Sequence, residues 1–160
     1  MKTESPFEGM GDLLWHPDYK KLWGGYGFRT DARVYQEIEK QIGLPILHLQ
    51  LIDSRFYHLD TCLAPITPKT ALYFPEAFTK EGRALLQRHF ADLIPVSEEE
   101  AAKGFACNGH APDGKHFLLQ KGNSVVCGDL QKRGIVPVEL ETSEFLKSGG
   151  SVFCLKMMLW

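Results

Sequence analysis

Three segments of this sequence hold the residue types that nucleophilic chemistry at a thiol requires. Residues 7–12 (FEGMGD) place two acids on a glycine-rich bend, and residues 56–62 (FYHLDTC) hold a histidine, an aspartate and a cysteine. Residues 147–155 (KSGGSVFCL) place a cysteine four residues after a pair of glycines. A thiol, an imidazole and an acid are the parts of a thiol-nucleophile site. The segments therefore predict covalent catalysis at a cysteine, provided that the fold brings them together.

The segment 55–62 is typical of a strand, and its polar residues then have more than one interpretation. Side chains alternate along a strand, so His58, Asp60 and Cys62 would share one face. An imidazole and a carboxylate are costly to bury unless they are paired or used. The three residues are therefore a hydrogen-bonded structural set, a solvent-facing row or part of a site.

Cys154 and Glu8 also have structural interpretations. Cys154 lies in an apolar run, where a cysteine is usually a small buried hydrophobe, and Glu8 could simply cap a turn. The two glycines before Cys154 favour a functional interpretation, because a ligand can closely approach a backbone that lacks Cβ atoms.

Length and composition exclude several classes of protein. The chain has 160 residues, of which 44% are hydrophobic and 24% charged, which suits one compact globular domain. A formal net charge of -2 disfavours a nucleic-acid binder. No apolar run approaches the ~20 residues of a membrane-spanning helix, and residues 1–6 lack the apolar core of a signal peptide. We therefore expect a cytoplasmic protein with neither a nucleic-acid nor a membrane partner.

The four cysteines give little support for a metal site or for disulfides. No CxxC pair is present, and the looser set of Cys107, His110, His116 and Cys127 is interrupted by Asn-Gly and Pro-Asp-Gly turns. Structural zinc sites usually carry tight ligand pairs, so zinc is only a minor alternative. Without an export signal, reduced thiols are the better interpretation. We expect no metal and no cofactor.

The pattern of apolar residues predicts an α+β fold, in which strand, strand, helix and strand recur about three times with a period of about 40 residues. The expected strands are 12–16, 21–25, 45–53, 55–62, 69–74, 94–96, 115–120, 135–140 and 152–160. The expected helices are 31–42 (capped by Thr30 and ended by Gly43), 79–90, a short one after Ser97, 124–133 and one turn at 144–147. A nucleotide-binding sheet is disfavoured, because neither GxGxxG nor GxxxxGK[ST] occurs.

Taken in this order, FEGMGD, FYHLDTC and KSGGSVFCLKMM resemble the guanidine-modifying pentein superfamily. Its members include arginine deiminases, dimethylarginine dimethylaminohydrolases, amidinotransferases and arginine dihydrolases. Residues 24–30 (GGYGFRT) resemble its GxGxRT segment, and Cys107-Asn108 resembles its alanine- or cysteine-Asn element. The resemblance runs from about residue 7 to residue 160 and is strongest to the dimethylarginine-hydrolase-like and arginine-dihydrolase-like branch.

The resemblance implies a hydrolase that acts on the guanidinium group of arginine or a methylated arginine through a covalent cysteine intermediate. Cys154 would be the nucleophile, His58 the general acid and base, and Glu8 the acid that orients the imidazole. Asp60 would hold the guanidinium by a two-point hydrogen bond, and Arg29 would bind the substrate carboxylate. The further substrate-binding candidates are Asp12, Gly150 and Asn108.

The resemblance also implies an architecture. The family fold is a closed α/β propeller of five ββαβ modules. Residues 1–160 would be a single catalytic-type domain with about three of them, the C-terminal part, so that the first two are missing. The chain would then be a fragment, the partner of a separate N-terminal half, or a homo-oligomer whose copies cover each other. Amidino transfer is the alternative reaction, and an inactive truncated remnant is the alternative to an enzyme.

Overall fold

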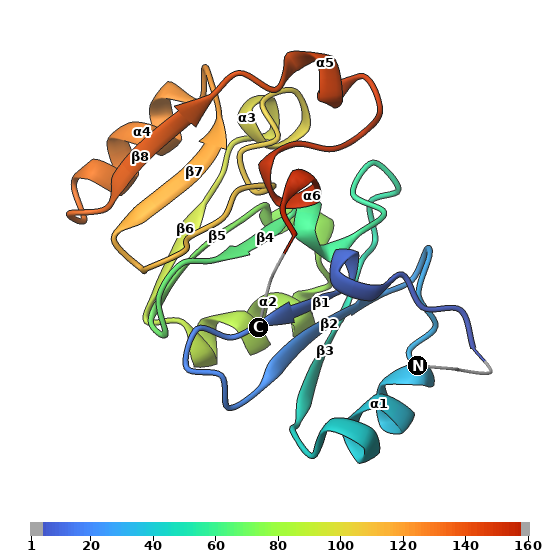
Figure 1. Ribbon diagram of the computed structural model, residues 1–160. Coiled ribbons are helices and arrows are strands. Elements are labelled where there is room, and N and C mark those ends of the chain that lie inside the picture. Colours follow the sequence, from blue (N-terminus) through green and yellow to red (C-terminus); the bar gives the residue numbers. More distant parts are fainter. Residues whose placement is uncertain (1–4, 158–160) are drawn as a thin grey trace.

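The computed structural model describes residues 5–157, and its first sheet follows the expected order (Figure 1). Strand β1 (Leu13–Trp15) pairs antiparallel with β2 (Leu22–Tyr26), and β2 pairs parallel with β3 (Ile46–Gln50). Helix α1 (Val34–Ile42) makes the crossover between the two parallel strands. A short 3-10 turn, η1 (Gly9–Gly11), leads into β1.

The second sheet repeats this arrangement. The turn η2 (Leu59–Thr61) leads into β4 (Leu63–Pro65), which pairs antiparallel with β5 (Thr70–Tyr73). Strand β5 pairs parallel with β6 (Asp92–Pro95). The crossover holds a short turn, η3 (Pro75–Ala77), and helix α2 (Lys80–His89). Two complete ββαβ repeats therefore follow one another, each opened by a 3-10 turn.

The third repeat is reduced. Strands β7 (His116–Gln120) and β8 (Val136–Leu140) are parallel, with helix α4 (Ser124–Gln131) between them. The antiparallel partner is a single bridge between His110 and Leu118. Three short helices complete the described chain: α3 (Glu98–Ala102), α5 (Ser143–Leu146) and α6 (Val152–Leu155). The three sheets follow one another around the molecule without closing into a ring (Figure 1).

The core consists of a large cluster and a small one. The large cluster joins all three repeats and includes Trp23, Phe74, Phe90 and Phe117. The small cluster packs α1 on its own sheet, because Val34, Tyr35 and Ile38 lie on one face of the helix. No helix in residues 5–157 is long and apolar enough to cross a membrane.

Two expected strands are wrong. Residues 56–58 run without regular structure into η2, so His58, Asp60 and Cys62 lie on a turn rather than on one face of a strand. The segment 152–160 begins as helix α6, and its last three residues lie outside the described chain. Both segments are apolar enough for a strand, but their backbones turn where the candidate site forms.

The expected start of the first helix is also wrong. The helix begins at Val34 and not at Asp31, and Thr30 does not cap it. The Thr30 hydroxyl instead donates to Asp12 Oδ2 (2.7 Å) and accepts the Glu8 N–H (3.1 Å). The predicted end is confirmed: Gly43 adopts a left-handed φ of 70° and donates its N–H to the Glu39 carbonyl.

Candidate active site

Helix α6 and turn η2 bring the first part of the site together. Cys154 lies on α6, beside the segment that leads into β4 (Figure 1). Its thiol donates to Asp60 Oδ2 at 3.4 Å, and the side-chain amide of Asn108 donates to its sulfur at 3.3 Å. Asp60 and Cys154 are 94 residues apart in the sequence. The contact therefore depends entirely on the tertiary fold.

His58 and Glu8 form the second part of the site. His58 precedes η2, and its Nε2 lies 3.6 Å from Glu8 Oε2. Within the described residues this buried Nε2 has no hydrogen-bond partner. The imidazole also lies against Gly11, where a Cβ would come within 3.0 Å of Nδ1. A glycine at position 11 thus leaves room for the ring.

Asp12 links the two turns. Its carboxylate is buried and accepts the Leu59 N–H at 2.9 Å in addition to the Thr30 hydroxyl. Burial raises the pKa of Asp12 in spite of these hydrogen bonds. Both carboxylate oxygens accept hydrogen bonds from protein groups, so this acid connects η1 and β1 to η2. A substrate contact for Asp12 stays a prediction.

Arg29 lies at the edge of the site. Its Nη1 is 3.9 Å from Glu8 Oε1, and its guanidinium lies over the ring of Tyr57 at 5.2 Å. The Tyr57 hydroxyl donates to the Gly149 carbonyl at 3.4 Å. Sequence reasoning missed Tyr57, although it directly precedes the candidate histidine.

The two glycines before Cys154 permit close packing. Gly149 has a left-handed φ of 81°, and a Cβ there would lie 2.8 Å from the Tyr57 hydroxyl oxygen. A Cβ on Gly150 would lie 2.9 Å from the Cβ of Cys154 itself. Side chains at these positions would displace the Tyr57 hydroxyl and the side chain of Cys154. The structure thus gives Gly150 a packing role, and a direct substrate contact stays a prediction.

Two acidic groups of the site have raised pKa values. Burial raises the pKa of Asp60 to about 7, and its Oδ1 has no hydrogen-bond partner in the described chain. Burial and the nearby Asp60 carboxylate raise the pKa of Cys154 to about 11. A cation bound between these groups would favour the ionised form of both.

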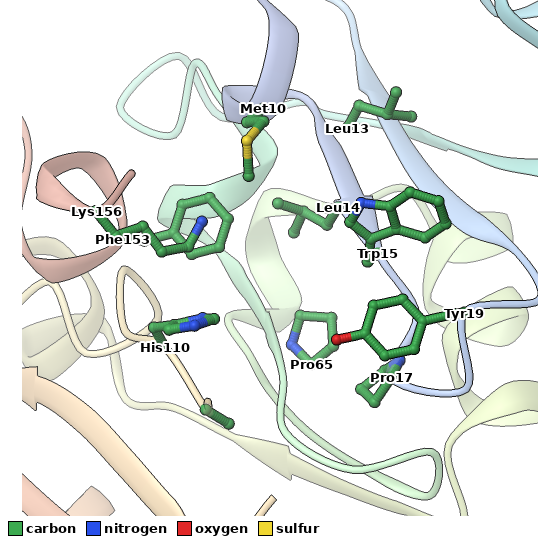
Figure 2. Close-up of a pocket in the computed structure, with 11 residues that line it drawn as sticks. Met10, Leu13, Leu14, Trp15, Pro17, Tyr19, Pro65, His110, Phe153 and Lys156 are labelled. Carbon is green, nitrogen blue, oxygen red and sulfur yellow. The ribbon is translucent and has the colours of Figure 1, made fainter. Parts of the chain in front are cut away.

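A hollow lies next to α6, with a cavity volume of about 80 Å³ (Figure 2). Side chains of β1 face it from one side, and Phe153, Lys156 and His110 face it from the other. The Lys156 ammonium lies 3.4 Å from the centre of the Phe153 ring. Burial lowers the pKa of Lys156. The hollow is mainly apolar and carries one amine at its rim.

The looser cysteine and histidine set does not form a metal centre. In residues 5–157, no three side chains of His, Cys, Asp or Glu are placed to hold a metal ion. Cys107 and Cys127 are buried in the large core cluster. His116 pairs instead with Asp113, with 2.7 Å between Nδ1 and Oδ2.

This combination of α+β repeats with a cysteine, a histidine and acids at their edge defines a protein of the pentein superfamily. The chain belongs to the family described as "N,N dimethylarginine dimethylhydrolase, eukaryotic", whose family model matches residues 1–159. The resemblance inferred from the sequence motifs is thus confirmed. The family is one of hydrolases that act on guanidino groups.

Two relatives illustrate the similarity. The chain is 41% identical over 147 residues to the N(G),N(G)-dimethylarginine dimethylaminohydrolase of Mycobacterium tuberculosis, covering 92% of this chain and 47% of that protein. It is 36% identical over 158 residues to a bifunctional arginine dihydrolase/ornithine cyclodeaminase of Nostoc sp., covering 98% of this chain and 22% of that protein. The chain thus spans about half of the first relative and about a fifth of the second.

Solved structures extend the comparison. A single-substitution variant of the N-terminal domain of ArgZ, an arginine dihydrolase from cyanobacteria, has been solved covalently bound to a reaction intermediate. The chain matches it with a TM-score of 0.89 and 34% identity, over 97% of this chain and 57% of that one. An amidinotransferase from Microseira wollei matches with a TM-score of 0.78 at 15% identity, over 96% of this chain and 48% of that one. This second match shows a shared fold alone.

Proposed function

We propose that this chain carries the nucleophile half of a cysteine-dependent hydrolase for the guanidinium group of arginine or a methylated arginine. The observation that carries the proposal is the contact between the Cys154 thiol and the Asp60 carboxylate. A buried carboxylate with one free oxygen offers a planar cation a hydrogen-bond acceptor beside the sulfur. The family assignment supports the same chemistry.

In the first step, the Cys154 sulfur attacks the guanidinium carbon. This carbon is a poor electrophile, so the thiolate is the species that reacts. The resting thiol is neutral because of burial and Asp60, and the bound cation offsets both effects. The thiol proton passes to His58. An S–C bond forms as the C–N bond to the leaving amine breaks, and His58 gives the proton to that amine.

In the second step, water replaces the sulfur. His58 takes a proton from the water, whose oxygen attacks the carbon of the covalent intermediate. The C–S bond then breaks, and the product carries a C=O group where the amine had been. Glu8, with an oxygen 3.6 Å from His58 Nε2, stabilises the imidazole while it is protonated, before it gives its proton to the leaving amine and after it takes one from water. This distance supports the role of orienting acid.

Arg29 is proposed to bind the carboxylate of the substrate. Its guanidinium is half-exposed beside Glu8 and over the Tyr57 ring, so it can exchange a weak contact for a charged substrate group. A carboxylate contact favours amino acids over decarboxylated amines. The relatives act on dimethylarginine or arginine by name, and we propose one of these two as substrate.

We further propose that additional ββαβ repeats complete the site, from a separate N-terminal half or from a second copy of this chain. The three sheets are open, and the exposed side chains of Met10 and Tyr19 flank the hollow of Figure 2. Apolar surface of this kind favours association. Molar mass by light scattering, with and without arginine, tests this proposal. A monomer that binds no guanidino compound would instead indicate an inactive remnant.

The hydrolase is tested by product release from L-arginine and from dimethylated arginine, with Cys154→Ser as control. Citrulline or ornithine together with ammonia or dimethylamine is expected from the wild type only. Mass spectrometry should also find the covalent adduct on the Cys154 peptide after acid quenching. Equal activity of wild type and Cys154→Ser would refute the mechanism, and products formed only with an added amine acceptor would indicate amidino transfer.

A further inference from the structure

Asn108 occupies the space between the nucleophile and the turn that carries Asp60. Its side chain is fully buried, with 0% of its surface exposed. The side-chain Nδ2 donates to the Asp60 carbonyl at 3.1 Å and to the Cys154 sulfur at 3.3 Å. Its Oδ1 accepts the Ser151 N–H at 2.8 Å. Every polar atom of this side chain is therefore bonded within the protein.

These partners fix the orientation of the amide. The Ser151 N–H can only donate, and the Asp60 carbonyl can only accept, so oxygen and nitrogen cannot be exchanged. The group that faces the sulfur is thus an N–H donor. A donor to sulfur favours the thiolate over the thiol. Asn108 consequently opposes the effects of burial and of Asp60 on the nucleophile.

The backbone of Asn108 also holds the nucleophile helix. Its carbonyl accepts the Phe153 N–H at 3.0 Å. Helix α6 has only four residues, Val152–Leu155, which is too short to persist on its own in water. The bonds from Asn108 to Ser151 and Phe153 therefore contribute to placing Cys154.

We propose that Asn108 is a positioning residue that holds α6 against η2 and stabilises the Cys154 thiolate by donating a hydrogen bond to it. This role rests on the proposed function and replaces the direct substrate contact that the family resemblance implies for Asn108. A side chain without exposed surface, whose two amide N–H groups are already bonded, has no donor left for a substrate and no surface that a substrate can reach.

The test is the pH dependence of Cys154 alkylation by iodoacetamide, followed by mass spectrometry of the peptide that contains it. Asn108→Asp retains the shape and an oxygen for Ser151, but it replaces the donor with an acceptor. Asn108→Ala removes both groups. In each variant we expect the midpoint of the pH profile of Cys154 alkylation to move upward by about one pH unit or more. The rate of alkylation at pH 8 should fall by about tenfold.

Asn123→Ala is the matched control. Asn123 is also fully buried, and its Nδ2 donates to the carbonyls of Gly104 and Gln120, away from the nucleophile. This variant should lower the melting temperature without moving the alkylation midpoint. Folded Asn108 variants with the wild-type midpoint would overturn the proposal, because a merely structural asparagine predicts that result.

A second measurement uses the wild type, in case the Asn108 variants do not fold. The side-chain amide NMR signals of Asn108 should shift when Cys154 is alkylated or ionised, whereas those of Asn123 should not. Unchanged Asn108 signals would contradict the hydrogen bond. Alkylation and NMR require no turnover, so a failure to hydrolyse guanidino compounds in the completed assembly would refute the proposed function without deciding the role of Asn108.

Discussion

The turns η1 and η2 end in the same way but lie in opposite chemical environments. They differ at the start, where ψ is 28° at Glu8 and 148° at His58. Each opens a ββαβ repeat, and each ends with the N–H of the capping residue donated to the first residue of the turn: Asp12 to Gly9, and Cys62 to Leu59. The capping residues have similar backbone angles, with φ −113° and ψ 1° at Asp12 and φ −131° and ψ 0° at Cys62. Residues 8–12 therefore correspond to residues 58–62.

The side chains at corresponding positions differ in burial. Glu8 is 43% exposed where His58 is 19% exposed. Met10 lies at the surface, whereas its counterpart Asp60 is buried with a raised pKa. Leu59 anchors η2 in the large core cluster, and its counterpart Gly9 has no such anchor. The buried turn η2 therefore holds the Asp60 carboxyl group close to the Cys154 sulfur. The exposed turn η1 is preceded by Glu8, an acid that is more accessible to solvent.

The largest expected effect comes from removing the buried charge of η2. Asp60→Asn should reduce guanidine hydrolysis by about 10³-fold, because in the proposed mechanism the substrate cation loses its charged partner beside the sulfur. The corresponding change in η1, Met10→Leu, should leave activity within about twofold, as expected of an exposed apolar residue. Both are measured as kcat/KM on arginine and dimethylarginine, and similar losses in both variants would contradict the comparison.

Asp60→Asn should also stabilise the fold at alkaline pH. The unfolded chain loses this proton near the ordinary value of 3.8, whereas the folded protein keeps it to about pH 7. The folded state thus binds more protons between these values, so the stability of the wild type falls as pH rises through this window. We expect Asp60→Asn to raise the free energy of unfolding at pH 8 by on the order of 2–4 kcal/mol relative to pH 4. Urea denaturation at pH 4 and pH 8 measures this difference. The same change in stability at both pH values would refute the prediction that the folded wild type holds a buried Asp60 carboxylate at pH 8.

The next effect concerns the two residues that precede the turns. His58→Gln should lower kcat by about 10²–10³-fold, because it removes the proton donor and acceptor. Glu8→Gln should lower kcat less, by about tenfold, because a half-exposed carboxylate near an imidazole stabilises its charge only modestly. A larger loss of kcat from Glu8→Gln than from His58→Gln would indicate that the exposed turn η1 contributes more to catalysis than η2. Single-turnover measurements with each variant give the chemical step directly.

The connection that Asp12 makes between the two turns is tested by measuring the free energy of unfolding rather than the activity. Asp12→Ala leaves the Thr30 hydroxyl and the Leu59 N–H without their acceptor, and we expect a loss of about 2–4 kcal/mol. Cys62→Ala, the corresponding change in η2, leaves only weak sulfur contacts unmade and should cost about 1–2 kcal/mol as a small core truncation. Urea midpoints of the two variants decide the order.

The smallest effect is a local steric one. Gly11→Ala places a methyl group within 3.0 Å of His58 Nδ1, so the ring must move, and we expect a loss of about threefold to tenfold in kcat. Gly9→Ala meets no atom within 4 Å but has a φ of 57°, so it should lower stability by about 1 kcal/mol and leave kcat unchanged. The reverse pattern would show that the imidazole is not held against η1.

Local patterns predicted most of the framework. Strands near 13–15, 22–26, 116–120 and 136–140 were expected within a few residues of their observed bounds, and Gly43 ends α1 as predicted. These features depend on neighbouring residues, which the sequence displays directly. The failures at 55–62, at 152–155 and at Thr30 share a cause. In each, the local preference is overridden by contacts with distant residues, such as Thr30 with Asp12 and Phe153 with Asn108.

The sequence by itself determined the α+β class, the order of the repeats and the residue types from which the site is built, because periodicity and motifs are local properties of the chain. Only the tertiary structure decided that the Cys154 thiol faces Asp60, that Asp12 joins two turns and that Asn108 is fully buried. Hydrogen-bond geometry and desolvation depend on which distant groups share a space. Packing across the repeats therefore gives the acid and the thiol their raised pKa values.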